Sequence, residues 1–208
     1  MTRRTYAQRC ALAHALDVVG ERWTLLVIRE LLTGPRRYGE LLANLPGMGT
    51  NLLAARLKDL AAAELIEKDD GAYALTAHGA ALEPAVLALA RWGAPMLVEA
   101  DEDEHWSATW NVVALKYSFR PDRARRARGV LEYRVDGTRV QARVRDGEVE
   151  TSLEPRWAAD VVLEADGETL LAIAGGTLDP DDAESDGSLR VDGDRRLYRS
   201  SLRFFALG

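Results

Sequence analysis

The sequence is poor in the side chains that most metal and redox sites need. Among its 208 residues is one cysteine, Cys10, so neither an intramolecular disulfide nor a cysteine-based zinc site can form. The three histidines, His14, His78 and His105, are scattered and have none of the spacings of metal ligands. We therefore expect no metal and no cofactor.

Long apolar runs are also missing. No segment approaches the roughly 18 apolar residues that a membrane helix needs. The N-terminal residues Met-Thr-Arg-Arg-Thr-Tyr carry charge but lack the apolar core of a signal peptide. We expect a soluble, cytoplasmic protein without a membrane partner.

Catalytic arrangements are absent too. The chain shows no order of nucleophile, histidine and acid, and no group of carboxylates at the spacing of metal ligands. The sequence therefore predicts a protein that is not an enzyme.

An overall excess of positive charge is lacking, because the formal net charge is −6. This argues against a protein that coats nucleic acid without regard to sequence. The charge is nevertheless uneven: residues 1–68 hold ten Lys/Arg and seven Asp/Glu, whereas residues 101–208 hold sixteen and twenty-two. A local basic surface in the N-terminal part thus remains compatible with the acidic total.

The spacing of apolar residues in the sequence changes near residue 100. Before it, Ala and Leu recur at helical spacing, whereas residues 129–165 alternate in steps of two between Asp-Gly turns. The acidic run Glu99-Ala-Asp-Glu-Asp-Glu104 at the change is typical of a solvated linker. We expect two domains, residues 1–99 and 105–208.

The N-terminal part predicts helices followed by a hairpin. The expected helices cover residues 10–19, 23–32, 38–45 and 50–63. Two short strands, 65–68 and 73–75, then flank the turn Asp69-Asp70-Gly71. Thr76 is placed to cap one further helix, which we expect to run to about Leu97.

Two short helices joined by Pro46-Gly47-Met48-Gly49, with a hairpin directly after them, form a winged helix–turn–helix pattern. The segments that carry this pattern are Cys10, Leu16–Arg22, Trp23–Tyr38, Leu45–Met48 and Leu53–Leu60. In order and spacing they resemble the HxlR-type winged-helix transcription regulators, which are relatives of the MarR group. The resemblance covers about residues 8–98 and implies a domain that binds double-stranded DNA.

The helix that starts near Thr50 is the expected recognition helix. A leucine stripe defines its buried face: Leu53, Leu57 and Leu60. The opposite face presents the residues that we expect to meet base edges and phosphates: Thr50, Asn51, Ala54, Ala55 and Lys58. Asn51 can form two hydrogen bonds with adenine, whereas the Thr50 hydroxyl suits a helix cap equally well. Arg56 lies between the faces and can reach a phosphate or a carboxylate.

Further DNA contacts are expected outside this helix. Arg36 and Arg37 lie just ahead of the preceding helix, which begins at Tyr38, and are placed for backbone phosphates. We expect Tyr38 to contact DNA as well. In the hairpin, Lys68 is the cation next to an Asp-Asp-Gly tip. Because cations are what the minor groove attracts, we expect this wing to touch phosphate through Lys68 and not to read the minor groove.

The helix expected at residues 76–98 carries an apolar stripe: Leu82, Val86, Leu89 and Trp92. The stripe either covers its own domain or joins two subunits. We favour a homodimer, because symmetry places two recognition helices roughly 34 Å apart on a palindromic operator.

Cys10 precedes the first helix. Some HxlR-type regulators sense oxidants through a cysteine at the matching place, although Ala11 follows Cys10 here where proline is common. The sequence leaves two roles open for Cys10, a buried small apolar side chain and a redox sensor.

The C-terminal part predicts a helix, several strands and further helices. Hairpins are expected at Asp136-Gly137 and Asp146-Gly147, a strand over residues 159–165, a helix over 168–174, a strand through Leu189 and Val191, and a helix over 195–206. This order, with the segments Asp160–Gly176 and Gly187–Asp194, resembles the sterol-carrier-protein-like (SCP2) fold over about residues 106–206. The resemblance implies an α/β sandwich with an antiparallel sheet and an apolar tunnel for a lipid-like molecule.

Apolar side chains of this part are the expected ligand contacts: Trp106, Trp110, Val113, Tyr117, Trp157, Leu170 and Phe204. A filled core uses the same residue types as a tunnel wall, so the sequence leaves both open.

The sequence thus predicts an α+β protein, a winged helix-turn-helix domain followed by an SCP2-like domain. We expect a DNA-binding transcription regulator, a repressor in preference to an activator, that responds to an apolar small molecule. One alternative is a regulator that senses oxidants through Cys10 and whose C-terminal domain binds no ligand. Another is a regulator whose C-terminal domain only dimerises and binds no ligand, and a third is an enzyme or lipid carrier that has lost DNA binding.

Overall fold

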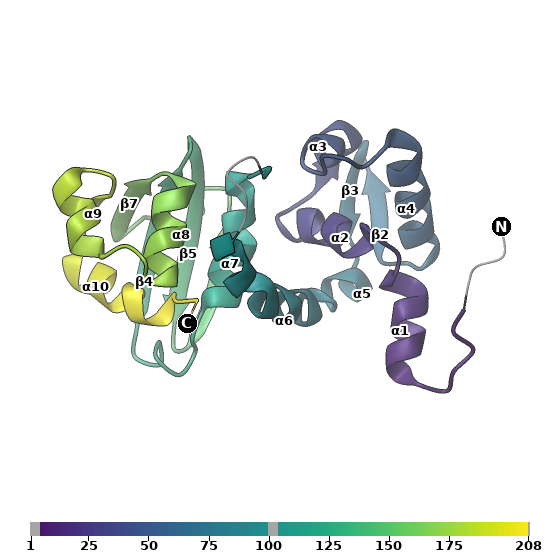
Figure 1. Ribbon diagram of the computed structural model, residues 1–208, viewed down its shortest axis with the longest axis horizontal. Coiled ribbons are helices and arrows are strands. Elements are labelled where there is room, and N and C mark those ends of the chain that lie inside the picture. Colours follow the sequence, from purple (N-terminus) through teal and green to yellow (C-terminus); the bar gives the residue numbers. More distant parts are fainter. Residues whose placement is uncertain (1–4, 100–103, 208) are drawn as a thin grey trace. The chain divides into compact units, whose positions relative to one another are not determined.

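The computed structural model describes residues 5–99 and 104–207 (Figure 1). The chain divides into two compact units, Met1–Val86 and Leu87–Gly208. The division falls inside a helix and precedes the acidic run at 99–104, of which residues 100–103 lie outside the described residues. The domain limits expected from the sequence, 1–99 and 105–208, stay a prediction.

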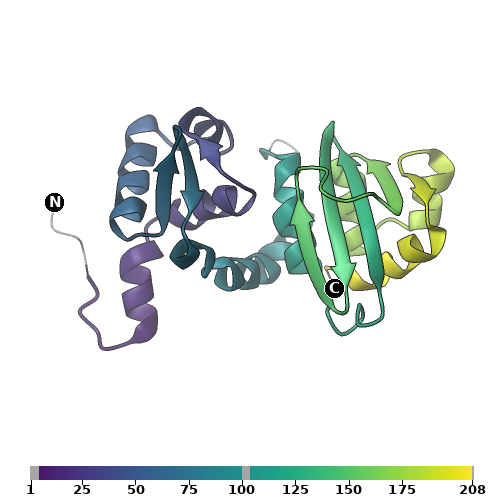
Figure 2. The ribbon, with the colours of Figure 1, turned by 180° about the vertical axis from the view of Figure 1, so that it is seen from behind.

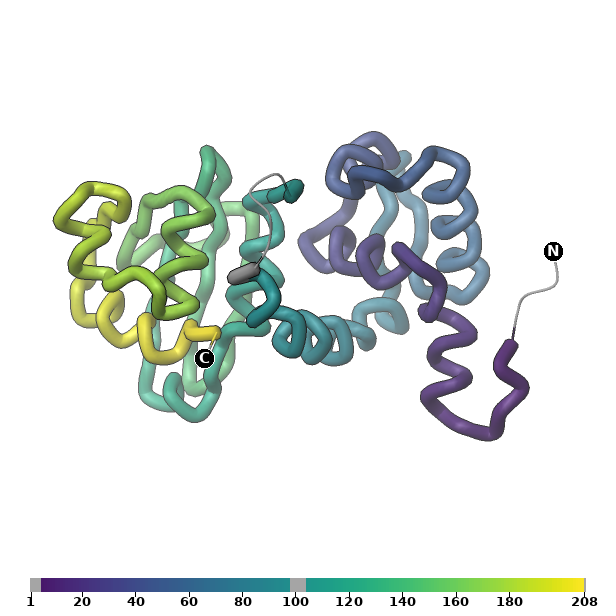
Figure 3. Tube along the Cα trace, in the orientation of Figure 1, coloured from purple at the N-terminus to yellow at the C-terminus, as the bar shows by residue number. Residues whose placement is uncertain are grey.

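The helices of the first unit confirm the expected elements. They are α1 (Ala11–Val19), α2 (Thr24–Leu32), α3 (Tyr38–Ala43), α4 (Thr50–Ala62) and the short α5 (Ala77–Ala80). Their apolar stripes form one core, in which Ile28, Leu41 and Leu53 are fully buried. The segment before α1 folds back along it (Figure 3), because the Tyr6 amide and the Thr5 hydroxyl both donate to the Asp17 carboxylate.

A three-stranded antiparallel sheet completes this unit. Its strands are β1 (Arg36–Arg37), β2 (Ile66–Asp69) and β3 (Ala72–Leu75), in the order β1-β3-β2. The hairpin of β2 and β3 was expected, and β1 was not. Two residues are too few to show an alternating pattern, and β1 is a strand only because Arg36 lies opposite Tyr73 and Arg37 opposite Ala72.

The prediction of a single helix at residues 76–98 is wrong. The segment forms α5, then α6 (Glu83–Gly93), then a 3₁₀ segment, η1 (Ala94–Glu99). Thr76 caps α5 as predicted, since its hydroxyl accepts from the Gly79 amide. Pro84 is the physical reason for the break: it has no amide hydrogen to continue a helix from α5, but it fits the first turn of α6.

The second unit is built on a five-stranded sheet in the order β6-β5-β4-β7-β8. Its strands are β4 (Arg128–Val135), β5 (Thr138–Arg145), β6 (Glu148–Ser152), β7 (Val161–Ala165) and β8 (Arg190–Gly193). β4 and β5 form the predicted hairpin, whose turn residues Asp136 and Gly137 have φ values of 48° and 76°. Positive φ at both central residues is the conformation for which Asp-Gly turns are selected.

The sheet is mixed, so the expectation of a purely antiparallel sheet, which came from the resemblance, is wrong. β4 and β7 are parallel, with Leu131 opposite Val161 and Tyr133 opposite Leu163. The reason is the path of the chain after β6. It returns over residues 153–160 to the end of the sheet at which β4 begins, so β7 must run in the direction of β4.

Helices cover one face of this sheet (Figures 1 and 2). They are α7 (Asn111–Ser118), which follows the 3₁₀ turn η2 (Ala108–Trp110), with α8 (Gly167–Gly175), α9 (Pro180–Asp186) and α10 (Arg195–Phe204). Between sheet and helices lies a core with Leu131, Tyr133 and Phe204. Along β4 and β5 the alternate residues face the other way and, apart from Val130, are polar or charged, as Arg134 and Arg143 show.

Among the described residues, no helix combines the length and the apolar character that crossing a bilayer would require. The same part of the chain holds no group of three or more His, Cys, Asp or Glu side chains arranged to bind a metal ion.

Candidate nucleic-acid interface

The outer face of α4 has the geometry expected of a recognition helix. Its leucine stripe is buried in the core of the first unit: Leu53, Leu57 and Leu60. The five residues predicted to meet DNA are all exposed on the remaining surface: Thr50, Asn51, Ala54, Ala55 and Lys58. This face therefore combines the Asn51 amide, the Thr50 hydroxyl and the Lys58 ammonium with two methyl groups.

The start of α4 is held by backbone contacts. Gly49 is the N-cap and the structure shows no side-chain cap bond there, so the Thr50 hydroxyl is not the cap that the sequence left open. The Tyr38 hydroxyl donates to the Thr50 carbonyl oxygen at 2.7 Å. Tyr38 thus ties α3 to α4 and orients the recognition helix, while its predicted contact with DNA stays a prediction.

Of the two partners that the sequence allows for Arg56, a phosphate or a carboxylate, the structure shows the carboxylate. Its guanidinium lies 3.0 Å from a carboxylate oxygen of Glu21 and 3.0 Å from one of Asp59. Its side chain is only 15% exposed. In the protein without DNA, Arg56 therefore links α4 to the turn before α2.

Arg36 and Arg37 lie where the sequence places them, just ahead of α3, but both are engaged. Arg36 donates to the Thr33 hydroxyl at 2.5 Å. The Arg37 amide donates to Glu40 at 2.6 Å, and its guanidinium lies 3.7 Å from an oxygen of Asp70. Arg37 therefore stands between the start of α3 and the tip of the wing.

The wing tip carries an ion pair that sequence reasoning missed. Asp70 is 97% exposed and forms its ion pair with a predicted phosphate-binding arginine. The pairing depends on β1 lying against β3, for which the sequence offers no local signal. Lys68 is exposed on β2, and its ammonium lies 5.1 Å from the centroid of the Tyr73 ring.

The stripe predicted to form a dimer is divided between its two alternative roles. Leu82 and Val86 pack into the core of the first unit. Leu89 and Trp92 are 52% and 70% exposed. Leu89 and Trp92 therefore remain available for a second subunit, as the homodimer hypothesis requires.

Cys10 is exposed immediately before α1. Of the two roles left open by the sequence, the structure does not show the buried apolar one. The exposed thiol leaves the sensor role untested.

The predicted ligand contacts of the second unit do not converge on one cavity. Val113 and Phe204 are buried, whereas Trp106 is exposed and its indole nitrogen donates to Asp136 at 3.2 Å. Trp157 lies against the Arg143 guanidinium, at 4.6 Å from the ring centroid, on the face of the sheet without helices. Trp110, Tyr117 and Leu170 are half-buried, and burial raises the pKa of Tyr117.

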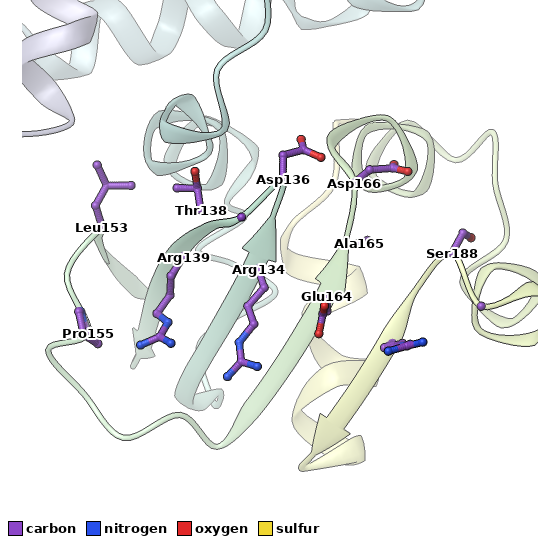
Figure 4. A pocket seen from close by; sticks show the side chains of 13 residues that line it. Arg134, Asp136, Thr138, Arg139, Leu153, Pro155, Glu164, Ala165, Asp166 and Ser188 are labelled. Atoms are coloured by element: carbon purple, nitrogen blue, oxygen red, sulfur yellow. The ribbon is translucent and has the colours of Figure 1, made fainter. Parts of the chain in front are cut away.

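A polar pocket of about 750 Å³ lies on that open face (Figure 4). Arg134, Arg139 and Glu164 point into it from neighbouring strands, and none of the seven predicted ligand contacts lines it. Beneath it, the buried Glu132 carboxylate pairs with Arg134 at 3.0 Å and Arg139 at 3.2 Å. Because charge lines this pocket, it is not the apolar tunnel that the resemblance implies.

Comparison with known families identifies both parts of the chain. The model of the HxlR-like helix-turn-helix family matches residues 18–101. The model of the SCP-2 sterol transfer family matches residues 114–201.

Curated proteins match the N-terminal part. The uncharacterized HTH-type transcriptional regulator sll1512 of Synechocystis is 36% identical over 95 residues, which are 42% of this chain and 70% of that protein. Rv3095 of Mycobacterium tuberculosis, also an uncharacterized HTH-type regulator, is 38% identical over 90 residues, and the chain spans 56% of its length. The HTH-type transcriptional regulator YodB of Bacillus subtilis is 32% identical over 85 residues, or 38% of this chain and 76% of that one.

Solved structures give partial likenesses. Quinone-bound YodB of B. subtilis has 33% identity and a TM-score of 0.38, covering 39% of this chain and 93% of that one. The sec-alkylsulfatase Pisa1 from Pseudomonas sp. has 22% identity and a TM-score of 0.43, covering 49% of this chain and 16% of that one.

Proposed function

The chain belongs to the HxlR-like helix-turn-helix family of transcriptional regulators and carries a domain of the SCP-2 sterol transfer family, and from this premise we propose that it represses transcription as a homodimer on a palindromic operator and is released by an apolar molecule. The N-terminal unit supplies the DNA contacts. The C-terminal unit supplies the binding site for the effector.

The observation that carries the proposal is the outer face of α4. The buried leucine stripe fixes which side chains point outward, and Asn51 and Lys58 are among them. An asparagine near the N-terminus of a recognition helix can read adenine through two hydrogen bonds. A lysine one or two turns later contacts phosphate and adds affinity without sequence preference.

The dimer is supported by apolar side chains that the fold leaves uncovered. Trp92 and Leu89 of α6 and Leu12 of α1 are each more than half exposed. Exposed side chains of this size mark an interaction surface when they gather on neighbouring turns of a helix, as Leu89 and Trp92 do. Two copies of α4 double the base contacts of one winged helix.

The effector role is supported by the SCP-2 family match and by half-buried aromatic side chains such as Trp110 and Tyr117. An apolar molecule that binds the released state better than the operator-bound state lowers operator affinity. Such couplings are typically about 1–3 kcal/mol. The polar pocket on the open face does not carry this role.

Titration of Asn51→Ala against a promoter fragment from the chain's own genomic neighbourhood tests the DNA-binding role. We expect operator affinity to fall by about 1–3 kcal/mol, the value of one bidentate base contact. Binding to a competitor duplex without the operator should stay unchanged, because Asn51 contacts no phosphate in the proposal. Equal weakening on both duplexes contradicts base reading by Asn51.

The exposure of Cys10 favours a second candidate, a regulator that an oxidant releases from DNA. The test is the release of operator by diamide from the wild-type chain and from Cys10→Ser. Oxidant-driven release that Cys10→Ser abolishes supports this candidate. Release that is the same in both proteins excludes it.

A further inference from the structure

A second pocket of the C-terminal unit is lined mainly by arginines. It lies between the segment that joins α7 to β4 and the helix α10, and its volume is about 660 Å³. The lining arginines are Arg123, Arg126, Arg128, Arg196 and Arg203. One acidic residue, Asp194, joins them, and Leu197 and Phe204 supply buried apolar side chains. We call this the arginine pocket.

The carboxylates at the arginine pocket are already engaged. Asp194 is the N-cap of α10, and its carboxylate accepts from the Arg196 and Leu197 amides at 2.8 and 2.9 Å. Asp160 lies beside Gly129 at the start of β4, and its carboxylate accepts from the Val130 amide at 2.8 Å. These bonds hold both carboxylates at backbone amides, and among the described residues neither carboxylate forms an ion pair with a lining arginine.

Three of the lining arginines form no ion pair with a carboxylate in the part of the chain that the structure describes. Within residues 5–99 and 104–207, the ion pairs include none formed by Arg126, Arg196 or Arg203. Arg128 pairs with Asp146 at 2.8 Å, and Arg123 donates to the backbone carbonyl of Arg203 at 3.3 Å. Among the described residues, four of the five lining guanidinium groups thus form no ion pair, and one carboxylate, that of Asp194, lines the same surface.

Several arginines elsewhere in the same unit form ion pairs. The structure shows Arg134 and Arg139 on Glu132, Arg143 on Glu150, Arg195 on Glu184 and Arg199 on Asp181. Carboxylates are plentiful in this chain, whose net charge is −6. A cluster of unpaired like charges in an acidic protein costs stability through repulsion, which an anion would relieve.

We propose that the arginine pocket binds a phosphate-bearing ligand. Guanidinium presents planar, paired N–H donors that match the oxygens of a phosphoryl group, and several such groups can surround one dianion. A volume of about 660 Å³ exceeds what a single phosphate needs and is within the range of small-molecule sites. The phosphoryl group belongs to a soluble phosphorylated molecule or to a phospholipid headgroup, two sources with the same binding chemistry.

The proposal is independent of the apolar effector. Phe204 is the one predicted apolar contact that lines this pocket, and a phosphoryl group would meet the arginines instead. Inorganic pyrophosphate carries no apolar group, so its binding tests the arginine pocket alone.

The first test is calorimetric titration of the full chain with sodium pyrophosphate at constant ionic strength. We expect Arg126→Gln and Arg203→Gln each to weaken binding about tenfold or more, because a hydrogen bond to a charged group is typically worth at least a tenfold change. Arg125→Gln is the matched control, since Arg125 is exposed in the same segment and does not line the pocket. A loss of binding in Arg125→Gln equal to that in Arg126→Gln and Arg203→Gln overturns the proposal.

The second test separates the two sources. Vesicles of phosphatidylglycerol are sedimented with the wild-type chain and with Arg126→Gln, and vesicles of phosphatidylcholine serve as the uncharged reference. Retention by phosphatidylglycerol that Arg126→Gln loses assigns the site to a lipid headgroup. Tight pyrophosphate binding without retention assigns it to a soluble ligand, and failure of both arms overturns the proposal.

Folding of the variants is checked by thermal unfolding. Because the substitutions remove repelling charges, we expect unfolding temperatures equal to or above that of the wild-type chain. Should one variant fail to fold, Arg196→Gln provides a third pocket position for the same titration.

Discussion

At the scale of single residues, Gly79 occupies a position where the packing of the backbone leaves no room for a Cβ atom. It lies in α5 against the end of the α4–β2 connection. A Cβ atom at this position would lie 2.0 Å from the Leu65 carbonyl oxygen, far inside contact distance. Because the obstacle is backbone, no rotation of a side chain can relieve the clash.

Gly79→Ala should therefore destabilise the first unit by about 1–3 kcal/mol, the usual cost of overpacking. Gly39→Ala is the matched control, since a Cβ there meets no atom within 4 Å and Gly39 is also helical. We expect the control to be neutral or slightly stabilising, because alanine favours helix over glycine. Urea unfolding of both variants provides the measurement. Equal stability of the two would contradict the steric role of Gly79.

Two buried tyrosines make the second unit sensitive to alkali. Burial raises the pKa of Tyr133 well above its ordinary value of 10.0 and raises that of Tyr198 to about 12. In the unfolded chain both phenols ionise near pH 10, so the folded state holds more protons above that pH. Their contribution to stability is thus complete below pH 10 and is lost as the pH rises toward the folded values.

Tyr133→Phe removes one of these ionisations. We expect the free energy of unfolding to decline less steeply between pH 10 and 12 in the variant than in the wild-type chain, because phenylalanine has no proton to lose. Urea titrations at pH 8, 10 and 11 measure the slope. A variant whose slope equals that of the wild-type chain would show that Tyr133 is not ionised on unfolding in this range.

At the scale of elements, the wing has an acidic tip on a domain that binds an acidic polymer. Asp70 holds Arg37 in an ion pair, although Arg37 is predicted to contact a backbone phosphate. Both side chains are largely exposed, so the pair itself adds little stability. Its effect on function is larger, since Asp69 and Asp70 would face DNA phosphates if the wing lies along the duplex.

Replacing Asp69 and Asp70 by Asn should strengthen binding to all duplexes by on the order of 1 kcal/mol at low salt, the size of one screened contact between charges. Two repulsive charges disappear and Arg37 is freed. The double variant Glu148→Gln/Asp192→Asn makes the same change of net charge in the second unit and is the control. Gel-shift titration measures both, and weaker binding by the wing variant would refute the expected role of the tip.

At the scale of the whole molecule, the proposed recognition of a palindromic operator depends on two copies of the chain. The uncovered pair Leu89 and Trp92 on α6 is the surface on which the proposed dimer relies. Large apolar groups buried between subunits carry most of the binding free energy of such interfaces.

The variant Leu89→Ser/Trp92→Ser should therefore be monomeric at micromolar concentration and should lose most of its operator affinity. Leu26→Ser is the control, because Leu26 is an exposed leucine of α2 outside this stripe. Sedimentation equilibrium measures the mass of each protein. A wild-type chain that sediments as a monomer would remove the basis of the palindromic operator.

Local patterns in the sequence were sufficient for most elements of both units. The leucine stripe of α4, the Thr76 cap and the Asp136-Gly137 turn each depend on residues within one or two turns of chain, so the sequence alone predicted them. The outward position of Asn51 and Lys58 followed from the same stripe. The break before α6 was also local, since Pro84 signals it, but the apolar periodicity on both sides obscured it.

Only the tertiary structure decided which distant segments meet. The pairing of β1 with β3, which brings Asp70 to Arg37, joins residues thirty or more positions apart, and so does the parallel pairing of β4 with β7. The arginine pocket likewise combines a segment before β4 with α10. Strand pairing and the convergence of like charges depend on the whole core being packed, so no window of neighbouring residues contains them.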